Sequence, residues 1–202
     1  MSEEVLADAG VGETVSSVAS AGVATGQAVT DIFRLARQQG FALPAVNCIG
    51  TNSVNGVLEA ARAVNAPVVV QFSNSGCAYF AGKSLGNDNM QISVLGCVAA
   101  AHYLRTVAPA YGVPVILHTD HCPKKHLPWI DGLLDAGERH FDQTGEPLYS
   151  SHMLDLSAEP LEENIETCAR YFERMARMGM TIEICLLYTS PSPRDLGSNL
   201  VW

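Results

Sequence analysis

Short runs of apolar residues recur along this chain, and helical patterns separate them. In the runs at residues 66–73 and 112–120, apolar side chains follow one another without the alternation of a half-exposed strand. Such runs are typical of strands that are covered on both faces, as in parallel sheets. Strands are expected to begin near residues 43, 67, 114, 149 and 180, with helices between them. This order predicts a parallel α/β sheet, either open and doubly wound or part of a (β/α)8 barrel.

Apolar stripes at helical spacing predict helices at about 30–40, 51–64, 93–111 and 157–179. Gly40 is expected to end the first of these, and Ser157 to cap the start of the last. The buried stripe of the last helix is expected to consist of Leu161, Ile165, Cys168, Phe172 and Met175. A dinucleotide-binding fold is disfavoured, because no Gly-x-Gly-x-x-Gly follows the first strand.

The charge balance narrows the range of partners. The chain has 12 Lys and Arg against 21 Asp and Glu, which gives a formal net charge of −9. Proteins that bind nucleic acid concentrate basic residues, so nucleic acid is excluded as a partner and any phosphorylated partner should be small. No run of about 18 uninterrupted apolar residues is present, and the acidic start is unlike a secretory signal. The expectation is a cytoplasmic protein that does not bind membranes.

The six cysteines are widely spaced, without a Cys-x-x-Cys pair. In a reducing compartment they are expected to be free thiols. Residues 1–26 are rich in small side chains and poor in aromatic ones, so they are expected to form a loose N-terminal arm.

Polar side chains follow the predicted strands at their carboxyl ends, where parallel α/β proteins collect their functional groups. They are Asn47, Ser73, Asp120, His121 and Asp155. The segment HTDHC at 118–122 gives the clearest local signal. An acid beside a histidine at such a strand end can supply a proton donor and a metal ligand. The alternative is a structural loop in which these side chains only cap and orient the backbone.

Six segments together resemble one enzyme family. They are FALPAVN (41–47), VQFSN (70–74), AGK (81–83), PVILHTDHC (114–122), LPWIDGLLD (127–135) and SSHMLDLS (150–157). In this order they resemble the class II, zinc-dependent fructose-bisphosphate aldolases of the class IIA type, from about Gly22 to Ile184. The resemblance implies a (β/α)8 TIM barrel, a homodimer, and reversible cleavage of fructose 1,6-bisphosphate into dihydroxyacetone phosphate and glyceraldehyde 3-phosphate.

The resemblance also implies roles for individual residues. Asp120 matches the acid that protonates the aldehyde oxygen in condensation, and His121 matches one of three histidines on the catalytic Zn2+. Asp155 matches a carboxylate of a neighbouring alternative metal position. Asn47 and Ser73 match positions that contact the substrate.

The resemblance is expected to stop after Ile184. Cys185 stands where the family has a second glutamate of the alternative metal position, and residues 185–202 resemble no aldolase segment. One synonymous codon choice for residues 185–195 spells the transposon-end adapter used in sequencing libraries, and residues 199–201 fit its continuation. Residues 27–184 are therefore interpreted as a barrel truncated after about the fifth strand, and 185–202 as an artefactual tail. The alternative is a genuine divergent tail.

The 202 residues as they stand are expected to lack activity, because the other two zinc histidines and the phosphate-binding glycine loops lie downstream in the family. Two further hypotheses stay open. One is an aldolase for another ketose bisphosphate, such as tagatose bisphosphate. The other is a non-catalytic module that binds a metal or phosphate.

Overall fold

A computed structural model of the chain describes residues 14–186 and 199–201. It contains one sheet in which β2 (Ala45–Asn47), β3 (Val68–Ser73), β4 (Pro114–Pro123), β5 (Ser151–Asp155) and β6 (Thr181–Cys185) lie side by side in chain order, all parallel. The short β1 (Gly22–Val23) pairs in parallel with the start of β4. Sequential parallel strands joined by helices are the pattern of a (β/α)8 barrel, here with part of its strands.

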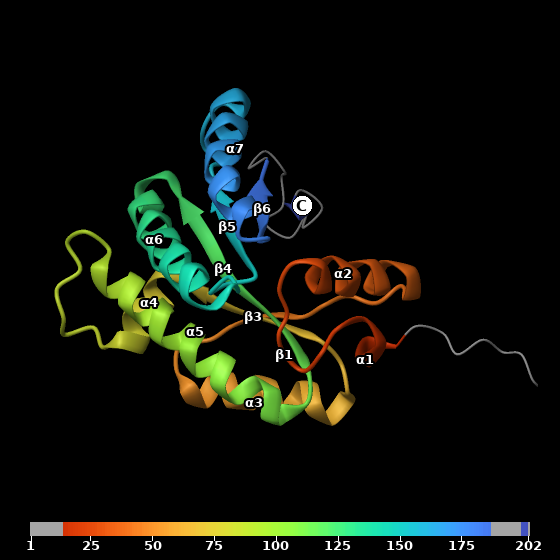
Figure 1. Cartoon of the computed structure of the whole chain (residues 1–202). Coiled ribbons are helices and arrows are strands. Elements are labelled where there is room, and N and C mark those ends of the chain that lie inside the picture. Colours follow the sequence, from red (N-terminus) through yellow and green to blue (C-terminus); the bar gives the residue numbers. More distant parts are fainter. Residues whose placement is uncertain (1–13, 187–198, 202) are drawn as a thin grey trace, which may run out of the picture.

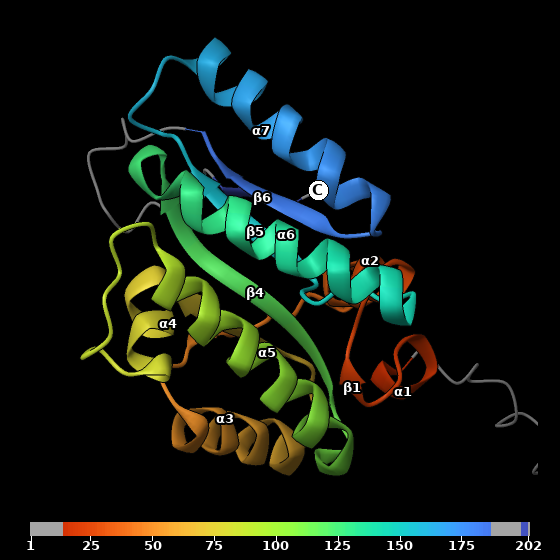
Figure 2. The ribbon, with the colours of Figure 1, turned by 60° about the vertical axis from the view of Figure 1, so that its left-hand side comes forward.

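Helices cover both faces of this sheet. The outer face carries α3 (Thr51–Val64), α5 (Gln91–Tyr111), α6 (Leu127–Thr144) and α7 (Leu161–Arg177), and α2 (Gln27–Gln39) lies on the opposite, inner face (Figures 1 and 2). Three short helices complete the order: α1 (Val15–Val18), α4 (Asn74–Ala81) and the 3-10 turn η1 (Lys124–His126). Gly40 ends α2 in a left-handed conformation, as expected.

The two faces of the strands have separate cores. On β3, Val70 and Phe72 join the large core beneath α3, α5, α6 and α7, whereas Val69 packs with Val29 and Ile32 of α2. Because both faces are buried, the strand sequence is apolar without alternation. Each such fully buried side chain stabilises the fold by about 1.5–3 kcal/mol.

Part of the expected loose arm is ordered. The Gly22 N–H donates to the Val113 carbonyl (3.0 Å), and the Ala24 N–H donates to the Val115 carbonyl (2.8 Å). The Ser150 hydroxyl donates to the Ala24 carbonyl (2.6 Å). The expectation of a loose arm is therefore wrong for residues 14–26. Small side chains, which suggested looseness, instead allow the backbone to pair closely with β4. Residues 1–13 lie outside the described part of the chain.

The start and the buried face of α7 also differ from expectation. Ser157 does not cap the helix, which begins at Leu161. Its hydroxyl donates to Asp155 (2.6 Å). The buried side chains of α7 are Asn164, Cys168, Tyr171 and Met175, while Leu161, Ile165 and Phe172 are exposed. The helix is rotated so that Asn164 can donate to the Cys185 carbonyl (2.8 Å).

The cysteines differ from expectation as well. Cys77 of α4 and Cys97 of α5 form a disulfide, while Cys48, Cys122, Cys168 and Cys185 are free and buried. Cys77 and Cys97 are close enough to bond because Gly96, which has no side chain, allows α5 to pack closely against α4. A Cβ atom on Gly96 would lie 1.8 Å from the Cys77 carbonyl oxygen.

The expected tail contributes one strand to the described residues. β7 (Asn199–Val201) pairs with β6 in antiparallel orientation, unlike every other pair in the sheet. Residues 187–198 and 202 lie outside the described part of the chain, so the interpretation of 185–202 as an artefact stays a prediction.

α5 is the one helix among the described residues that is long and apolar enough to cross a membrane. Its side chains at Cys97, Ala101 and Leu104 are buried in the large core. It packs as the central helix of the outer layer.

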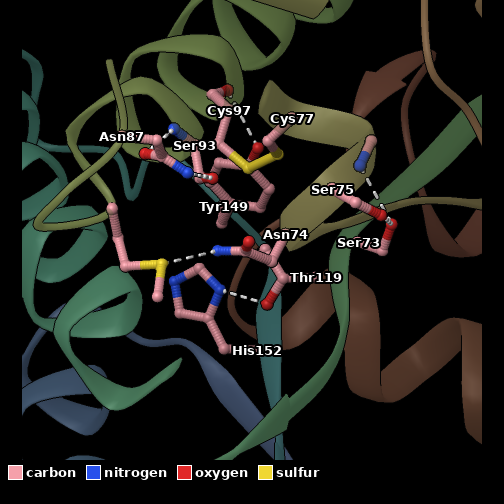
Figure 3. Close-up of a disulfide and its surroundings, with 12 residues drawn as sticks. Ser73, Asn74, Ser75, Cys77, Asn87, Ser93, Cys97, Thr119, Tyr149 and His152 are labelled. Atoms are coloured by element: carbon pink, nitrogen blue, oxygen red, sulfur yellow. Dashed lines mark hydrogen bonds between the residues drawn. A yellow bond between two sulfur atoms is a disulfide. The ribbon is translucent and has the colours of Figure 1, made fainter. Parts of the chain in front are cut away.

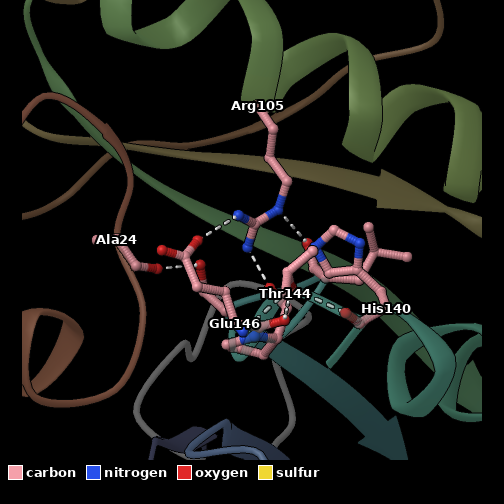
Figure 4. Close-up of polar contacts among 8 residues, drawn as sticks. Ala24, Arg105, His140, Thr144 and Glu146 are labelled. Atoms are coloured by element: carbon pink, nitrogen blue, oxygen red, sulfur yellow. Dashed lines mark hydrogen bonds and ion pairs between the residues drawn. The ribbon is translucent and has the colours of Figure 1, made fainter. Parts of the chain in front are cut away.

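Arg105 of α5 holds the loop between α6 and β5 (Figure 4). Its guanidinium donates to the carbonyls of Pro147 and Leu148 and to the Glu146 carboxylate (3.1 Å). Burial lowers the pKa of Arg105. This residue supplies hydrogen bonds that two inward-facing carbonyls need.

Gly96→Ala is predicted to destabilise the fold by about 1–3 kcal/mol, because the added methyl group meets backbone that cannot move freely. Gly56→Ala on α3 is the matched control, since its Cβ has open space, and alanine there should stabilise by about 0.5–1 kcal/mol. Urea unfolding followed by circular dichroism measures both. Equal effects of the two substitutions would contradict the close packing of α4 on α5.

Arg105→Ala is predicted to cost about 1–3 kcal/mol, since it leaves the Pro147 and Leu148 carbonyls without their donor. Glu146→Ala removes only the ion pair with a carboxylate that is 63% exposed, so it should change stability by less than about 1 kcal/mol. The same unfolding assay separates the two. A larger loss for Glu146→Ala would show that the ion pair, and not the carbonyl bonds, holds the loop.

Candidate active site

Four neighbouring strands end in the polar side chains that the sequence singled out. Asn47 ends β2, Ser73 ends β3, Asp120 and His121 lie near the end of β4, and Asp155 ends β5. Ser73 is paired in register with Asp120. The structure therefore gathers all five predicted site residues at the carboxyl edge of the sheet.

A β-bulge orients the two residues on β4. Asp120 and His121 are consecutive, so a regular strand would point them to opposite faces. The pairing of β4 with β5 shifts register between Thr119 and Cys122, and His121 has a φ of 33°. The bulge turns the His121 ring to the side where Asp155 lies. A left-handed conformation of a non-glycine residue costs about 1–3 kcal/mol and is often found at functional sites.

Hydrogen bonds and an ion pair join these side chains into a continuous line. Asn47 Nδ2 donates to Asp120 Oδ2 (2.7 Å), and Asp120 Oδ1 lies 3.8 Å from His121 Nε2. His121 Nδ1 is 2.9 Å from Asp155 Oδ2, and the Ser157 hydroxyl donates to the other oxygen of Asp155. The line, which we call the rim line (Asn47, Asp120, His121 and Asp155), crosses from β2 to β5.

Charges around the ring raise the pKa of His121 above its ordinary value. The hydrogen bond to Asp155 contributes most, burial opposes it, and the nearby carboxylates of Asp120, Asp155 and Glu183 also raise it. The same bond, with those from Ser157, holds the pKa of Asp155 well below its usual range. Asp155 is therefore ionised at neutral pH and fixes the orientation of the His121 ring.

A second histidine lies below the rim line. His118, also on β4, is buried, and its Nδ1 is 2.6 Å from the Ser151 hydroxyl. Its Nε2 lies 3.2 Å from a Glu183 carboxylate oxygen on β6. His118 is therefore a buried residue beneath the site.

Glu183 and Ser157 contact the site residues, although the sequence alone predicted no role for them there. The position of Glu183 could have been predicted from the sequence. It stands between Ile182 and Ile184, and because side chains alternate along a strand, it points to the opposite face of the sheet from both isoleucines. Both isoleucines pack in the outer core, so Glu183 faces inward. The contact of Ser157 with Asp155 could not have been predicted, because a serine before a helical pattern is equally typical of a helix cap.

Ser73 contacts the helix that follows it. Its hydroxyl accepts a hydrogen bond from the Gly76 N–H (3.1 Å) in the first turn of α4. Residues 74–81, directly after β3, form the helix α4. This helix fixes the Ser73 side chain at the edge of the site.

The donor set of the site fits one corner of a metal centre. His121 has Nδ1 on a carboxylate and Nε2 directed away from it, which is how metal-binding histidines are oriented in proteins. In the described part of the chain, no three His, Cys, Asp or Glu side chains are grouped so that they could hold a metal ion. A zinc site needs at least three protein ligands. These residues by themselves therefore do not make a complete zinc site.

Comparison with known proteins gives one family. Residues 27–189 match the family model described as fructose-bisphosphate aldolase class-II. The match continues five residues past Ile184, where the resemblance was expected to stop. The chain is 60% identical over 164 residues to the fructose-bisphosphate aldolase class 2 of Escherichia coli K12, covering 81% of this chain and 46% of that protein. It is 52% identical over 163 residues to the fructose-bisphosphate aldolase of Saccharomyces cerevisiae, covering 81% and 45%.

Solved structures agree with the sequences. The crystal structure of fructose-bisphosphate aldolase from Campylobacter jejuni superposes with a TM-score of 0.81 at 48% identity, covering 85% of this chain and 49% of that one. The expected fold, an incomplete (β/α)8 barrel, is confirmed by this match. The chain spans about half the length of the curated relatives it matches. By its family match and its close relatives, this chain belongs to the class II fructose-bisphosphate aldolases.

Proposed function

We propose that the protein of which this chain forms a part catalyses reversible, zinc-dependent aldol cleavage of fructose 1,6-bisphosphate to dihydroxyacetone phosphate and glyceraldehyde 3-phosphate. The observation that carries the proposal is the rim line, which joins an acid, a histidine and a second carboxylate at the carboxyl ends of adjacent strands. Relatives that carry this name at 52–60% identity support the choice of reaction.

Asp120 is the proton-transfer residue of this proposal. In cleavage, its carboxylate accepts the proton of the substrate hydroxyl that becomes the aldehyde oxygen. The carbon–carbon bond then breaks, and its electron pair stays with the ketone fragment. In condensation, Asp120 returns the proton to the aldehyde oxygen. The Asn47 amide occupies Oδ2 of Asp120, so Oδ1 is the oxygen left to exchange the proton.

The neighbouring residues bind and orient. Asn47 and Ser73 lie on the two strands beside Asp120, and we assign them to contacts with the substrate. His121 is assigned as one zinc ligand, and Asp155 as the carboxylate that orients it and that ligates the alternative metal position. Zinc, when bound, supplies a Lewis acid that polarises the ketone and stabilises the negative charge left by bond cleavage.

The proposal also includes the class of substrate, the oligomeric state and the cellular location of the enzyme. The substrate is a small phosphorylated sugar, the intact protein is a homodimer, and it acts in the cytoplasm. A partner of this size agrees with a chain of net charge −9 that has few basic residues.

The first test joins residues 1–184 to the remaining half of the E. coli relative. This chimera is predicted to retain zinc after desalting and to cleave fructose 1,6-bisphosphate in a coupled assay. The 202-residue chain should do neither, because its described residues include no group of three side chains that could hold a metal ion. A folded but inactive chimera contradicts the proposal. A preference for tagatose bisphosphate changes the substrate, and zinc retained by the 202-residue chain favours a metal-binding module.

The second test separates the acid from the ligand within the chimera. Asp120→Ala should keep its zinc and lose about a hundred- to ten-thousandfold in turnover, as expected for removal of a general acid. His121→Ala should lose zinc and activity together, with at most partial recovery on added zinc. Zinc content by atomic emission and turnover are measured on the same samples. Loss of zinc from Asp120→Ala, with zinc kept by His121→Ala, would reverse the two assignments.

A further inference from the structure

The disulfide between Cys77 and Cys97 lies in the same region of the molecule as Ser73 (Figure 3). It joins α4, which follows Ser73 without a linker, to α5, the central outer helix. Both cysteines are fully buried, with 0% exposure. Neither the proposed reaction nor the proposed metal site uses them.

α4 packs closely on α5, but few of its own side chains are buried. Gly76 and Cys77 are its only fully buried residues, and Tyr79 is 57% exposed. Phe80 packs edge-to-face on Phe72, with ring centroids 6.0 Å apart. A short helix that buries few side chains of its own depends on its contact with α5 to stay in place. The covalent bond reinforces that contact.

The opposite end of the bond is rigid. The Cys97 carbonyl accepts a hydrogen bond from the Tyr149 hydroxyl (2.9 Å), and Tyr149 is buried just before β5. Two thiols also need more space than a disulfide, because non-bonded sulfur atoms stand at van der Waals distance. Gly96 holds the backbones of the two helices close together, and Tyr149 anchors α5 at Cys97, so we expect reduction to loosen α4 more than α5.

We propose that the Cys77–Cys97 disulfide is a redox-controlled tether that holds α4, and through its first turn the Ser73 side chain, against the body of the protein. Ser73 is coupled to α4 by its hydrogen bond from the Gly76 N–H. The consequence for substrate binding rests on the role proposed for Ser73, but the tether itself does not. In a reducing compartment, bonds of this kind are usually transient and redox-sensing.

The oxidant is a small disulfide such as glutathione disulfide. Because both cysteines are buried, the exchange takes place when α4 opens locally. One cysteine thiolate then attacks the glutathione disulfide, forms a mixed disulfide and releases one glutathione thiolate. The second cysteine thiolate then displaces the other glutathione. The two cysteines lose two protons and two electrons, and two molecules of reduced glutathione carry them away. Dithiothreitol reverses the exchange and is itself oxidised to its cyclic disulfide.

Thiol counting on the 202-residue chain tests the bond. After incubation with glutathione disulfide, alkylation in denaturant without reductant should modify four of the six cysteines, and six after dithiothreitol. Cys97→Ala should give five under both conditions. The control Cys168→Ala, at another buried cysteine, should give three and then five. Six modified cysteines in the oxidised native chain would overturn the proposal.

Hydrogen exchange tests the tether. Reduction should speed exchange of the amides in residues 74–81 by about tenfold or more, and leave the amides of α6 unchanged. Cys97→Ala should show the fast rate whether or not reductant is present, and Cys168→Ala should respond like the original chain. Equal exchange of α4 in the oxidised and reduced chain would refute control of α4, even if the bond forms. Neither measurement needs catalysis, so the outcome is independent of the proposed reaction.

Discussion

The pairing of β4 on both of its edges is the constraint on which the rest of the structure depends. Its ten residues pair with β3 along one edge, and with β1 and then β5 along the other. Val115 and Leu117 point into the outer core, while Ile116 packs beneath α2. Because the strand is fixed from both edges and both faces, its carboxyl end has a defined position from which side chains can be aimed.

The bulge at the end of β4 converts this rigidity into a site. Without the register shift, Asp120 and His121 would face opposite sides of the sheet. With it, one residue meets Asn47 and the other meets Asp155. The unfavourable φ of His121 persists because pairing resumes at Cys122 and Pro123, which are in register with β5. The same backbone feature therefore sets both the acid and the histidine.

Much of the fold followed from the sequence because buried parallel strands have an apolar pattern that few other elements share. The strands near 67, 114 and 180 begin within a residue or so of their observed starts, and the five polar residues predicted at strand ends do lie at the carboxyl edge of the sheet. Contacts between segments that are distant in the sequence were harder to predict. Only the packed structure shows that Gly96 admits Cys77, or that Asn164 and not Leu161 faces the core.

Local signals failed where two physical effects competed. Ser157 suits a helix cap, yet the ionised Asp155 attracts its hydroxyl more strongly than a backbone amide does. The small residues of 19–24 suggested an arm, but their size permits close backbone pairing.

α2 covers part of the inner face of the sheet with apolar side chains. Val29 and Ile32 meet Val69 and Ile116 there and keep water from that end. The rim line thus has solvent on one side, and on the other the buried His118 and Glu183 followed by this apolar layer. Fields in such an arrangement are screened on one side only, so an anion or a cation senses these charges mainly along the path from solvent. The electric field of these charges therefore guides an ion toward the site from the solvent side, before the ion contacts any residue.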